Sequence, residues 1–150
     1  MTGGPVWSGF RFTRDVVPSE TGNEIHLHNL TIAELLFDAR NAYVEAVGIP
    51  WASLFASDRN LVMRRLEIDF ESESPAGLPV KVGVRATTRS RRALIFEEAV
   101  WRVEPPHAIA VARSVHVVVR LSAPGAIALP GDLVERFETY ERGPLSGPTG

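Results

Sequence analysis

The pattern of apolar and polar positions predicts one long helix in the first third of the chain. Apolar residues recur there at the i, i+3, i+4, i+7 spacing of a helix that buries one face. They are Ile32, Leu35, Leu36, Ala39, Tyr43, Ala46 and Val47. Thr31 followed by Glu34 matches a capping box and predicts the helix start, while Gly48 and Pro50 predict its end. This helix needs another layer to cover its apolar face.

Alternation of apolar and polar residues predicts strands in most of the remaining chain. The strands are expected within residues 6–17, 60–72, 80–86, 93–103 and 108–121, the last with Val111, Val115, Val117 and Val119 on one face. Residues 89–92 are expected to form a hairpin tip. The pair Pro105-Pro106 ends a strand, because proline donates no ladder hydrogen bond. A short helix opening at Pro130 and Asp132 is expected to dock on the sheet through Leu133, Phe137 and Tyr140.

This order of elements predicts an α+β fold in a single domain that spans residues 1–150. Strands joined by tight turns pair antiparallel, so we expect a five-stranded antiparallel sheet wrapped around the one long helix. The glycine-rich segment 1–5 and the Gly/Pro/Ser segment 143–150 are expected to be flexible. An exposed edge strand needs covering, which favours a homodimer or homotetramer.

Composition narrows the possible functions. A net charge of −2 gives no overall attraction to nucleic acid or to an anionic membrane. The absence of cysteine excludes disulfides, thiolate metal sites and a cysteine nucleophile. The sequence begins without a signal-peptide pattern, and no stretch approaches the roughly 20 apolar residues of a membrane span. We therefore expect a soluble, cytoplasmic protein.

Polar and ionisable side chains gather just before the predicted helix. They are Glu20, Asn23, Glu24, His26, His28 and Asn29. A helix N-terminus presents unpaired N–H groups and about half a positive charge, which suits a carboxylate, a phosphate or a developing oxyanion. The sequence therefore places the candidate site here. A His-x-His pair without a third ligand at suitable spacing does not predict a metal site.

Several short motifs around the helix match one known family. Asp38-Ala39-Arg40 corresponds to that family's helix motif, E/D-A-R. Counting back from it places Asn29 and His26 on the loop motif D-x-D-x-x-G-H/V-V-x-N/H. Gly48-Ile49-Pro50-Trp51, the strand 66–70, the basic turn 89–92 and the closing LPGDLVERF add further matches. Over about residues 10–142 the chain resembles hotdog-fold acyl-CoA thioesterases of the 4-hydroxybenzoyl-CoA thioesterase type.

The resemblance implies a hotdog fold and hydrolysis of an acyl thioester of coenzyme A or of an acyl carrier protein, at sites between subunits. Coenzyme A would be part of the substrate, with no separate cofactor. The family's catalytic Asp aligns with Gly22, and the first Asp of its motif aligns with Glu20. Glu20 is therefore the first candidate for the carboxylate that attacks the thioester or activates water. Glu24 is the second candidate.

Other residues near the helix have two interpretations each. The backbone N–H of Asn29 matches the family's donor to the thioester oxygen, although Asn29 could also be a simple N-cap. His26 or His28 could orient water or act as a base, or either could be a surface histidine. Glu34 lies where another hotdog branch places its carboxylate, although the capping box also explains it, and Asp38 is expected to be solvated or paired with Arg. His116 is expected to face a partner subunit.

Substrate-binding residues follow from the same resemblance. Arg89, Arg91 and Arg92 could hold the nucleotide phosphates of coenzyme A, or they could form a solvated turn. Leu36, Phe37 and Tyr43 are expected to shape an acyl pocket. Two other functions remain open: a hotdog dehydratase or hydratase that uses a histidine with a carboxylate, and a non-catalytic acyl-CoA binding module, which Gly22 at the Asp position favours.

Overall fold

The structure is a computed structural model that describes residues 5, 7–18 and 27–147. Glu20, Gly22, Glu24 and His26 lie outside the described residues. In chain order the elements are β1 (Phe12–Val16), α1 (Asn29–Ala46), α2 (Trp51–Ala56), β2 (Arg59–Phe70), β3 (Val80–Arg89), β4 (Ala93–Arg102), β5 (His107–Arg120), β6 (Ala123–Ile127) and α3 (Gly131–Glu141).

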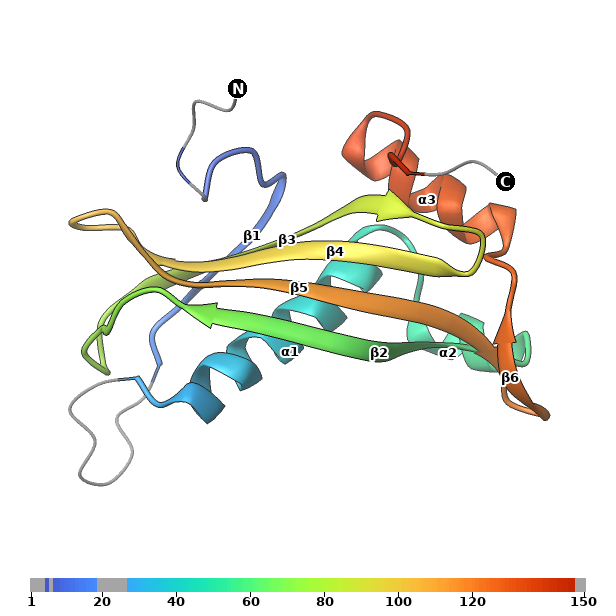
Figure 1. Ribbon diagram of the computed structural model, residues 1–150, viewed down its shortest axis with the longest axis horizontal. Coiled ribbons are helices and arrows are strands. Elements are labelled where there is room, and N and C mark those ends of the chain that lie inside the picture. The colour runs from blue at the N-terminus through green and yellow to red at the C-terminus, as the bar shows by residue number, and fades with distance from the viewer. Residues whose placement is uncertain (1–4, 6, 19–26, 148–150) are drawn as a thin grey trace.

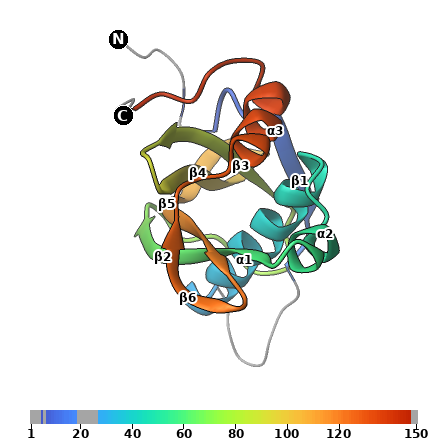
Figure 2. The same cartoon turned by 90° about the vertical axis from the view of Figure 1, so that its right-hand side faces the viewer.

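The strands form one antiparallel sheet that curls around α1. The strand order is β1-β3-β4-β5-β2, and β6 pairs with β5. In Figures 1 and 2, α1 runs along one face of this sheet, and α3 lies against β3 at the end where β3 terminates. The predicted sheet around one long helix is therefore confirmed, as is the hairpin tip between β3 and β4.

Within the described residues the sheet has six strands, one more than predicted. β6 was missed because its sequence, APGAI, has no apolar alternation and contains both Pro and Gly, which are depleted in strands. It forms because β5 is longer than β4. The first residue of β4, Ala93, pairs with Val117, and β5 continues to Arg120. β6 pairs with the residues that follow, 118–120. Tertiary context, rather than local preference, makes this strand.

Helix α1 begins three residues earlier than the capping box predicted, with its N-cap at His28 in place of Thr31. His28 is the N-cap, and its side chain accepts a hydrogen bond from the N–H of Leu30. Thr31 therefore lies inside the first turn, and the predicted Thr31–Glu34 capping box is wrong, because a ring nitrogen just upstream already caps the helix. At the other end, Gly48 adopts φ +101°, the left-handed conformation predicted for it.

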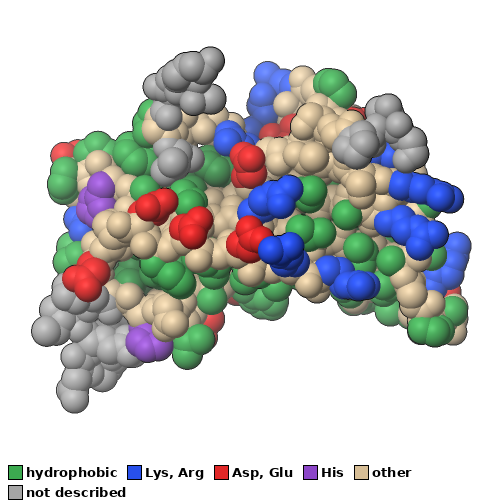
Figure 3. Space-filling model, in the orientation of Figure 1, with side chains coloured by type: hydrophobic (Ala, Val, Ile, Leu, Met, Phe, Trp, Pro, Cys, Tyr) green, Lys and Arg blue, Asp and Glu red, His purple; other side chains and the backbone are tan. Residues whose placement is uncertain are grey.

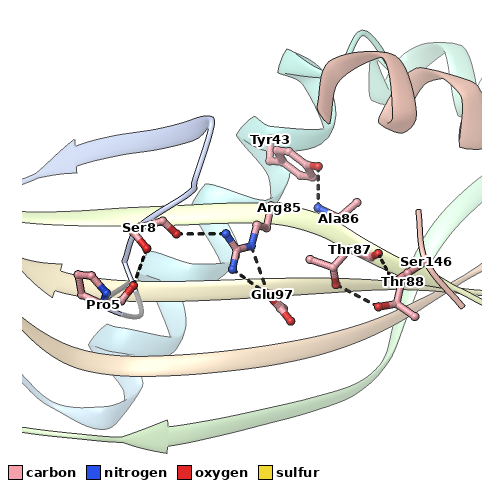
Figure 4. Close-up of polar contacts among 9 residues, drawn as sticks. All are labelled: Pro5, Ser8, Tyr43, Arg85, Ala86, Thr87, Thr88, Glu97 and Ser146. Carbon is pink, nitrogen blue, oxygen red and sulfur yellow. Dashed lines mark hydrogen bonds and ion pairs between the residues drawn. The ribbon is translucent and has the colours of Figure 1, made fainter. Parts of the chain in front are cut away.

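Tyr43 is at the centre of the core between α1, the sheet and α3. Four aromatic rings lie 5.3–5.8 Å from its ring: Phe12, Phe96, Phe137 and Tyr140. Its hydroxyl donates to Glu141. The same hydroxyl accepts from the N–H of Ala86, as Figure 4 shows. Burial raises the pKa of the Tyr43 hydroxyl well above its ordinary value, so it stays protonated. Helix α3 docks as predicted, with Leu133 and Phe137 buried.

The outer face of the sheet, which points away from α1, carries a row of alternating charges. Side chains of four neighbouring strands stand opposite one another in register: Glu67 of β2, Arg113 of β5, Glu97 of β4 and Arg85 of β3. Figure 3 shows acidic and basic side chains intermixed over the middle of this face. We call these four residues the outer row.

The segment after α3 packs against β3, contrary to the flexible tail predicted from residue 143. The N–H of Ser146 donates to the carbonyl of Thr87, and the N–H of Arg89 donates to the carbonyl of Ser146; Figure 4 shows Ser146 beside this part of β3. Glu138 of α3 also accepts from the N–H of Leu145. These bonds fix residues 143–147 despite their Gly/Pro/Ser composition. Residues 1–4 and 148–150 lie outside the described residues.

Candidate active site

Helix α1 starts on the molecular surface, directly after the polar segment that the sequence singled out. The side chains of His28 and Asn29 both accept a hydrogen bond from the N–H of Leu30, at 3.2 and 3.0 Å. The first N–H groups of a helix have no partner within the helix, and Asn29 is the first residue of α1. Its backbone N–H is therefore a donor of the kind that stabilises an oxyanion. His28, Asn29 and Leu30 are all exposed.

The capping role of His28 fixes which ring nitrogen carries the proton. Nδ1 accepts from the N–H of Leu30, so in the neutral ring the hydrogen sits on Nε2. His28 therefore offers a donor to its surroundings, which suits orienting a water or a carbonyl oxygen. It becomes a base through Nδ1 only after the bond to Leu30 is released.

Other predicted residues of α1 are placed as follows. Glu34 and Asp38 are exposed on the helix surface. The backbone carbonyl of Asp38 accepts from Arg14 at 3.3 Å. No ion pair of the Asp38 carboxylate occurs among the described residues, in line with the solvated alternative.

The three arginines at the β3–β4 hairpin lie at the other end of the molecule from the start of α1 (Figure 1). Arg91 and Arg92 are exposed, and Arg89 is half-buried. Within the part of the chain that the structure describes, none of the three forms an ion pair. Helix α1 has 18 residues, about 27 Å at 1.5 Å per residue, and it spans much of the separation. One protomer therefore does not bring the arginines and the start of α1 together.

A cavity of about 140 Å³ lies between α1 and the sheet. Its wall consists of Phe37, Arg40, Asn41, Val44, Trp51, Leu61, Met63, Phe96 and His116. Of the three predicted acyl-pocket residues, Phe37 contributes to this wall and is 56% exposed. Leu36 and Tyr43 are fully buried in the core and are not part of the wall.

A buried chain of polar side chains borders this cavity, and sequence reasoning missed it. Arg40 of α1 donates to Glu98 at 2.7 Å, and the hydroxyl of Ser114 donates to the other oxygen of Glu98 at 2.5 Å. Nε2 of His116 lies 2.8 Å from the Ser114 oxygen. We call Arg40, Glu98, Ser114 and His116 the inner network. Its members are 0–6% exposed.

His116 faces α1, so the expectation that it faces a partner subunit is wrong. The inward positions of β5 are Ala110, Ala112, Ser114, His116 and Val118, while the valines expected to share one face lie on the outer side. The ring of His116 packs on Phe96 at 4.3 Å. One feature of the sequence could have revealed the network: Glu97 and Glu98 are adjacent in an apolar strand, so one of them must point inward.

Burial sets the protonation of the inner network. It raises the pKa of Glu98 above its ordinary value, and Arg40 and Ser114 oppose that shift. Burial, with a smaller contribution from Arg40, lowers the pKa of His116 to about 3, so the ring is neutral near pH 7. Because the Ser114 hydroxyl hydrogen goes to Glu98, Ser114 accepts from Nε2–H of His116, which leaves Nδ1 as a hydrogen-bond acceptor.

The described part of the chain contains no cluster of three or more His, Cys, Asp or Glu side chains that could hold a metal ion. Among the same residues, no helix combines the length and the apolar character needed to cross a membrane.

Comparison with known proteins identifies the family. A model of the thioesterase-like superfamily matches residues 16–137, so the chain belongs to the thioesterase-like superfamily. This match, together with structural neighbours that are hotdog thioesterases, confirms the resemblance and the predicted hotdog fold. No curated protein matches the chain.

Three solved structures illustrate the similarity. A hypothetical protein from Staphylococcus aureus in complex with CoA has a TM-score of 0.80 at 12% identity, over 93% of this chain and 89% of that one. A 1,4-dihydroxy-2-naphthoyl-CoA thioesterase from Synechocystis has a TM-score of 0.74 at 16% identity, over 87% and 95%. A 12:0-ACP thioesterase from Umbellularia californica has a TM-score of 0.76 at 14% identity, over 86% and 53%. At identities this low, the similarity shows a shared fold and nothing more specific.

Proposed function

We propose that the protein hydrolyses acyl thioesters of coenzyme A or of an acyl carrier protein. The observation that carries the proposal is the exposed start of α1 at Asn29 in a chain of the thioesterase-like superfamily. The sequence just before Asn29 is rich in carboxylates and histidines. The similar structures include a CoA complex, a naphthoyl-CoA thioesterase and an ACP thioesterase, which supports a thioester substrate of either kind.

In the proposed mechanism, the loop supplies the reactive carboxylate and the helix start supplies the donor. Glu20, or Glu24 in its place, attacks the thioester carbonyl or removes a proton from the attacking water. The carbonyl oxygen becomes negatively charged and is stabilised by the backbone N–H of Asn29. The carbon–sulfur bond then breaks and releases a thiolate. If the carboxylate has attacked, a mixed anhydride remains, water hydrolyses it to the free acid and the regenerated carboxylate, and the thiolate takes a proton from water. If the carboxylate has acted as a base, it passes the proton of the attacking water to the thiolate. Nε2–H of His28, or His26, orients the water.

We also propose that the working unit is a homodimer or a larger homo-oligomer. The twelve-residue strand β2 forms one end of the sheet and pairs with β5 on one side, and such a long edge favours pairing with another chain. Two apolar side chains of β2 itself are exposed: Met63 is 43% exposed and Phe70 is 53% exposed. A partner would also bring its Arg89, Arg91 and Arg92 towards the start of α1, where they could bind the phosphates of coenzyme A.

The proposal is tested by measuring free thiol released from aromatic and aliphatic acyl-CoA thioesters of increasing length, and from acyl carrier protein thioesters. Glu20→Gln and Glu24→Gln are compared with Glu45→Gln, which changes an exposed carboxylate on α1. We expect one loop variant to lose at least about 100-fold in turnover, as loss of a general base does, without loss of stability. Unchanged turnover in both loop variants would refute a loop carboxylate.

The two other functions give different results in the same samples. A dehydratase or hydratase would change 2-enoyl thioesters without releasing thiol. A binding module would be stabilised against heat by coenzyme A without any turnover.

A further inference from the structure

The β3–β4 hairpin carries three arginines whose charges are not compensated within the described residues. Arg89, Arg91 and Arg92 lie close together in the sequence, without an acidic neighbour between them. None of their guanidinium groups has an ion pair or a hydrogen bond in the part of the chain that the structure describes. Like charges at such short separation repel one another. The backbone of the hairpin is nevertheless held from two directions.

The first contact comes from residues 145–147, which we call the tail clamp. Ser146 adds to the edge of β3 through a single parallel bridge with Thr88. Its N–H donates to the carbonyl of Thr87 at 3.0 Å, and its carbonyl accepts from the N–H of Arg89 at 2.8 Å. On the same edge of β3, β1 pairs only with residues 80–84. The tail clamp therefore supplies the backbone partners for the last residues of β3, where the hairpin begins.

The second contact holds the tip of the hairpin. The N–H of Leu129, just before α3, donates to the carbonyl of Arg91 at 2.9 Å. Leu129 and the tail clamp lie on either side of α3 in the sequence, and α3 is anchored in the core by Phe137, which is 1% exposed. Glu138 of α3 also accepts from the N–H of Leu145 at 2.9 Å. An anchored helix thus holds the hairpin through the segments at both of its ends.

These contacts order the hairpin backbone without neutralising its charge. They use only N–H and C=O groups of the hairpin. The acidic residues near the end of α3, Glu138 and Glu141, accept from Leu145 and Tyr43 and not from an arginine. A contact that served stability alone would gain from pairing one of these carboxylates with an arginine. An ordered backbone with free guanidinium groups suits an anion from outside, because a preorganised site loses less freedom on binding.

We propose that the tail clamp positions the hairpin arginines for phosphate binding and thereby sets the affinity for thioesters of coenzyme A. It acts through the arginines and does not touch the substrate. The inference rests on the proposed function, in which these arginines bind the phosphates of coenzyme A beside the start of α1 in a partner. An acyl-pantetheine thioester has the same reacting group but no phosphate, so its binding should not depend on the tail clamp.

Gly147→Ala displaces the tail clamp with a minimal change. A Cβ at Gly147 would overlap the carbonyl oxygen of Arg89, and its φ of +127° disfavours a side chain. We expect the KM for an acyl-CoA thioester to rise about tenfold, with kcat within about twofold, and the KM for the acyl-pantetheine thioester to stay unchanged. Gly143→Ala is the matched control, since a Cβ there meets no atom within 4 Å. An equal rise for both substrates, or no rise for acyl-CoA, would overturn the proposal.

Ser146→Pro is a second way to displace the tail clamp, because it removes the N–H that bonds Thr87. The same separation of the two substrates is expected. Urea unfolding of each variant shows that the chain is folded under the conditions of the assay. A variant that loses its fold would weaken both substrates alike, whereas a displaced clamp weakens only the one that carries phosphates.

Replacing Arg89, Arg91 and Arg92 together by Gln tests whether the tail clamp acts through the arginines. This variant should raise the KM for acyl-CoA and leave that for acyl-pantetheine unchanged. Adding Gly147→Ala to it should produce little further rise, because the charges that the clamp positions are already gone. A further rise as large as in the wild-type background would contradict the assigned route.

Binding of coenzyme A without turnover separates this inference from the proposed function. Dissociation constants of coenzyme A and of pantetheine are measured by calorimetry on the full chain of each variant. If no thioester is hydrolysed, the proposed function fails, while weaker binding of coenzyme A in Gly147→Ala than in Gly143→Ala still supports the tail clamp. Equal affinities in these two variants, or no binding of coenzyme A to the wild type, would overturn it even if thioesters are hydrolysed.

Discussion

The inner network and the outer row lie on opposite faces of the same strands, and they differ in their access to water. Glu98 and Glu97 are neighbours in β4, yet the Glu98 side chain is 0% exposed and the Glu97 side chain is 48% exposed. Each accepts a hydrogen bond from an arginine, at 2.7 and 3.0 Å. The contact geometry is similar, so the difference between the two pairs comes from burial.

The comparison shows why distance alone does not rank ion pairs. A pair at the surface contributes about 0–1 kcal/mol, because water already solvates both charges. In a buried pair, both charges have lost their water, and removing one partner leaves the other without compensation, at a cost of about 3–5 kcal/mol. Substitutions on the two faces should therefore differ several-fold in their effect on stability.

The largest effect is expected for Glu98→Gln. This variant leaves the Arg40 charge buried without a counter-charge, so the free energy of unfolding should fall by about 3–5 kcal/mol, measured by urea denaturation. The double variant Arg40→Met/Glu98→Leu should regain at least half of that loss, because no buried charge remains. A loss below about 1 kcal/mol in Glu98→Gln would remove the distinction between the two faces.

Tyr43→Phe tests whether the loss of buried hydrogen bonds, without the loss of an ion pair, lowers the free energy of unfolding nearly as much as Glu98→Gln does. The hydroxyl donates to Glu141 and accepts from Ala86, so its removal leaves two groups without their partner. We expect a loss of about 2–3 kcal/mol in thermal or urea unfolding. Tyr140→Phe is the control, since no hydrogen bond of the Tyr140 hydroxyl occurs among the described residues, and it should change stability by less than about 0.5 kcal/mol.

His116 should make the stability depend on pH. Its pKa is about 3 in the folded chain and 6.5 as the ordinary value. As the pH falls below 6.5, the unfolded chain gains a proton that the folded chain does not, so stability decreases as the pH falls towards 3. The slope is about 1.4 kcal/mol per pH unit, or about 2 kcal/mol between pH 6.5 and 5.

Urea unfolding of the wild type and of His116→Gln, from pH 7 to pH 5, measures this dependence. The variant should lack the slope, while His107→Gln should keep it. Arg40 and Glu98 belong to the same network, so the difference between the two curves, rather than either curve alone, isolates His116. Parallel curves would show that His116 is not held neutral.

The smallest effect is expected for Glu97→Gln on the outer row. Its partner Arg85 also bonds the carbonyl of Ser8 and lies 4.5 Å from the ring of Phe10, so the arginine remains held. The loss should be below about 1 kcal/mol and should shrink in 1 M salt, where the screening length is about 3 Å. A loss as large as that of Glu98→Gln would contradict the role of burial.

Periodicity predicted most of the fold, because the helix and five of the strands each bury one regular face. It gave the wrong orientation for His116, since apolar residues occupy both faces of β5, and alternation then does not tell which face meets α1. It also missed β6, whose pairing depends on the length of β5. The adjacent Glu97 and Glu98 could have indicated one inward-facing carboxylate. Its partners Arg40 and Ser114 could not be identified from the sequence, because they are far from Glu98 along the chain and meet it only in the folded state.

For the candidate site, the sequence placed the exposed start of α1 correctly to within three residues. Its reactive carboxylate, Glu20 or Glu24, remains a prediction, because both residues lie outside the described ones. The cavity beneath α1 was anticipated through Phe37 alone, since a cavity depends on side chains from several elements at once.

The short contact between Ser146 and β3 affects the symmetry of any assembly. β1 pairs with residues 80–84 of β3, and Ser146 forms hydrogen bonds with Thr87 and Arg89 further along the same strand. The β3 side of the sheet is therefore covered by the five-residue strand β1 and by the segment around Ser146. The opposite side ends in the long strand β2. If copies join through that edge, each uses the same strand, and the contact is isologous. Such an assembly closes on itself as a two-fold pair and does not grow into a filament.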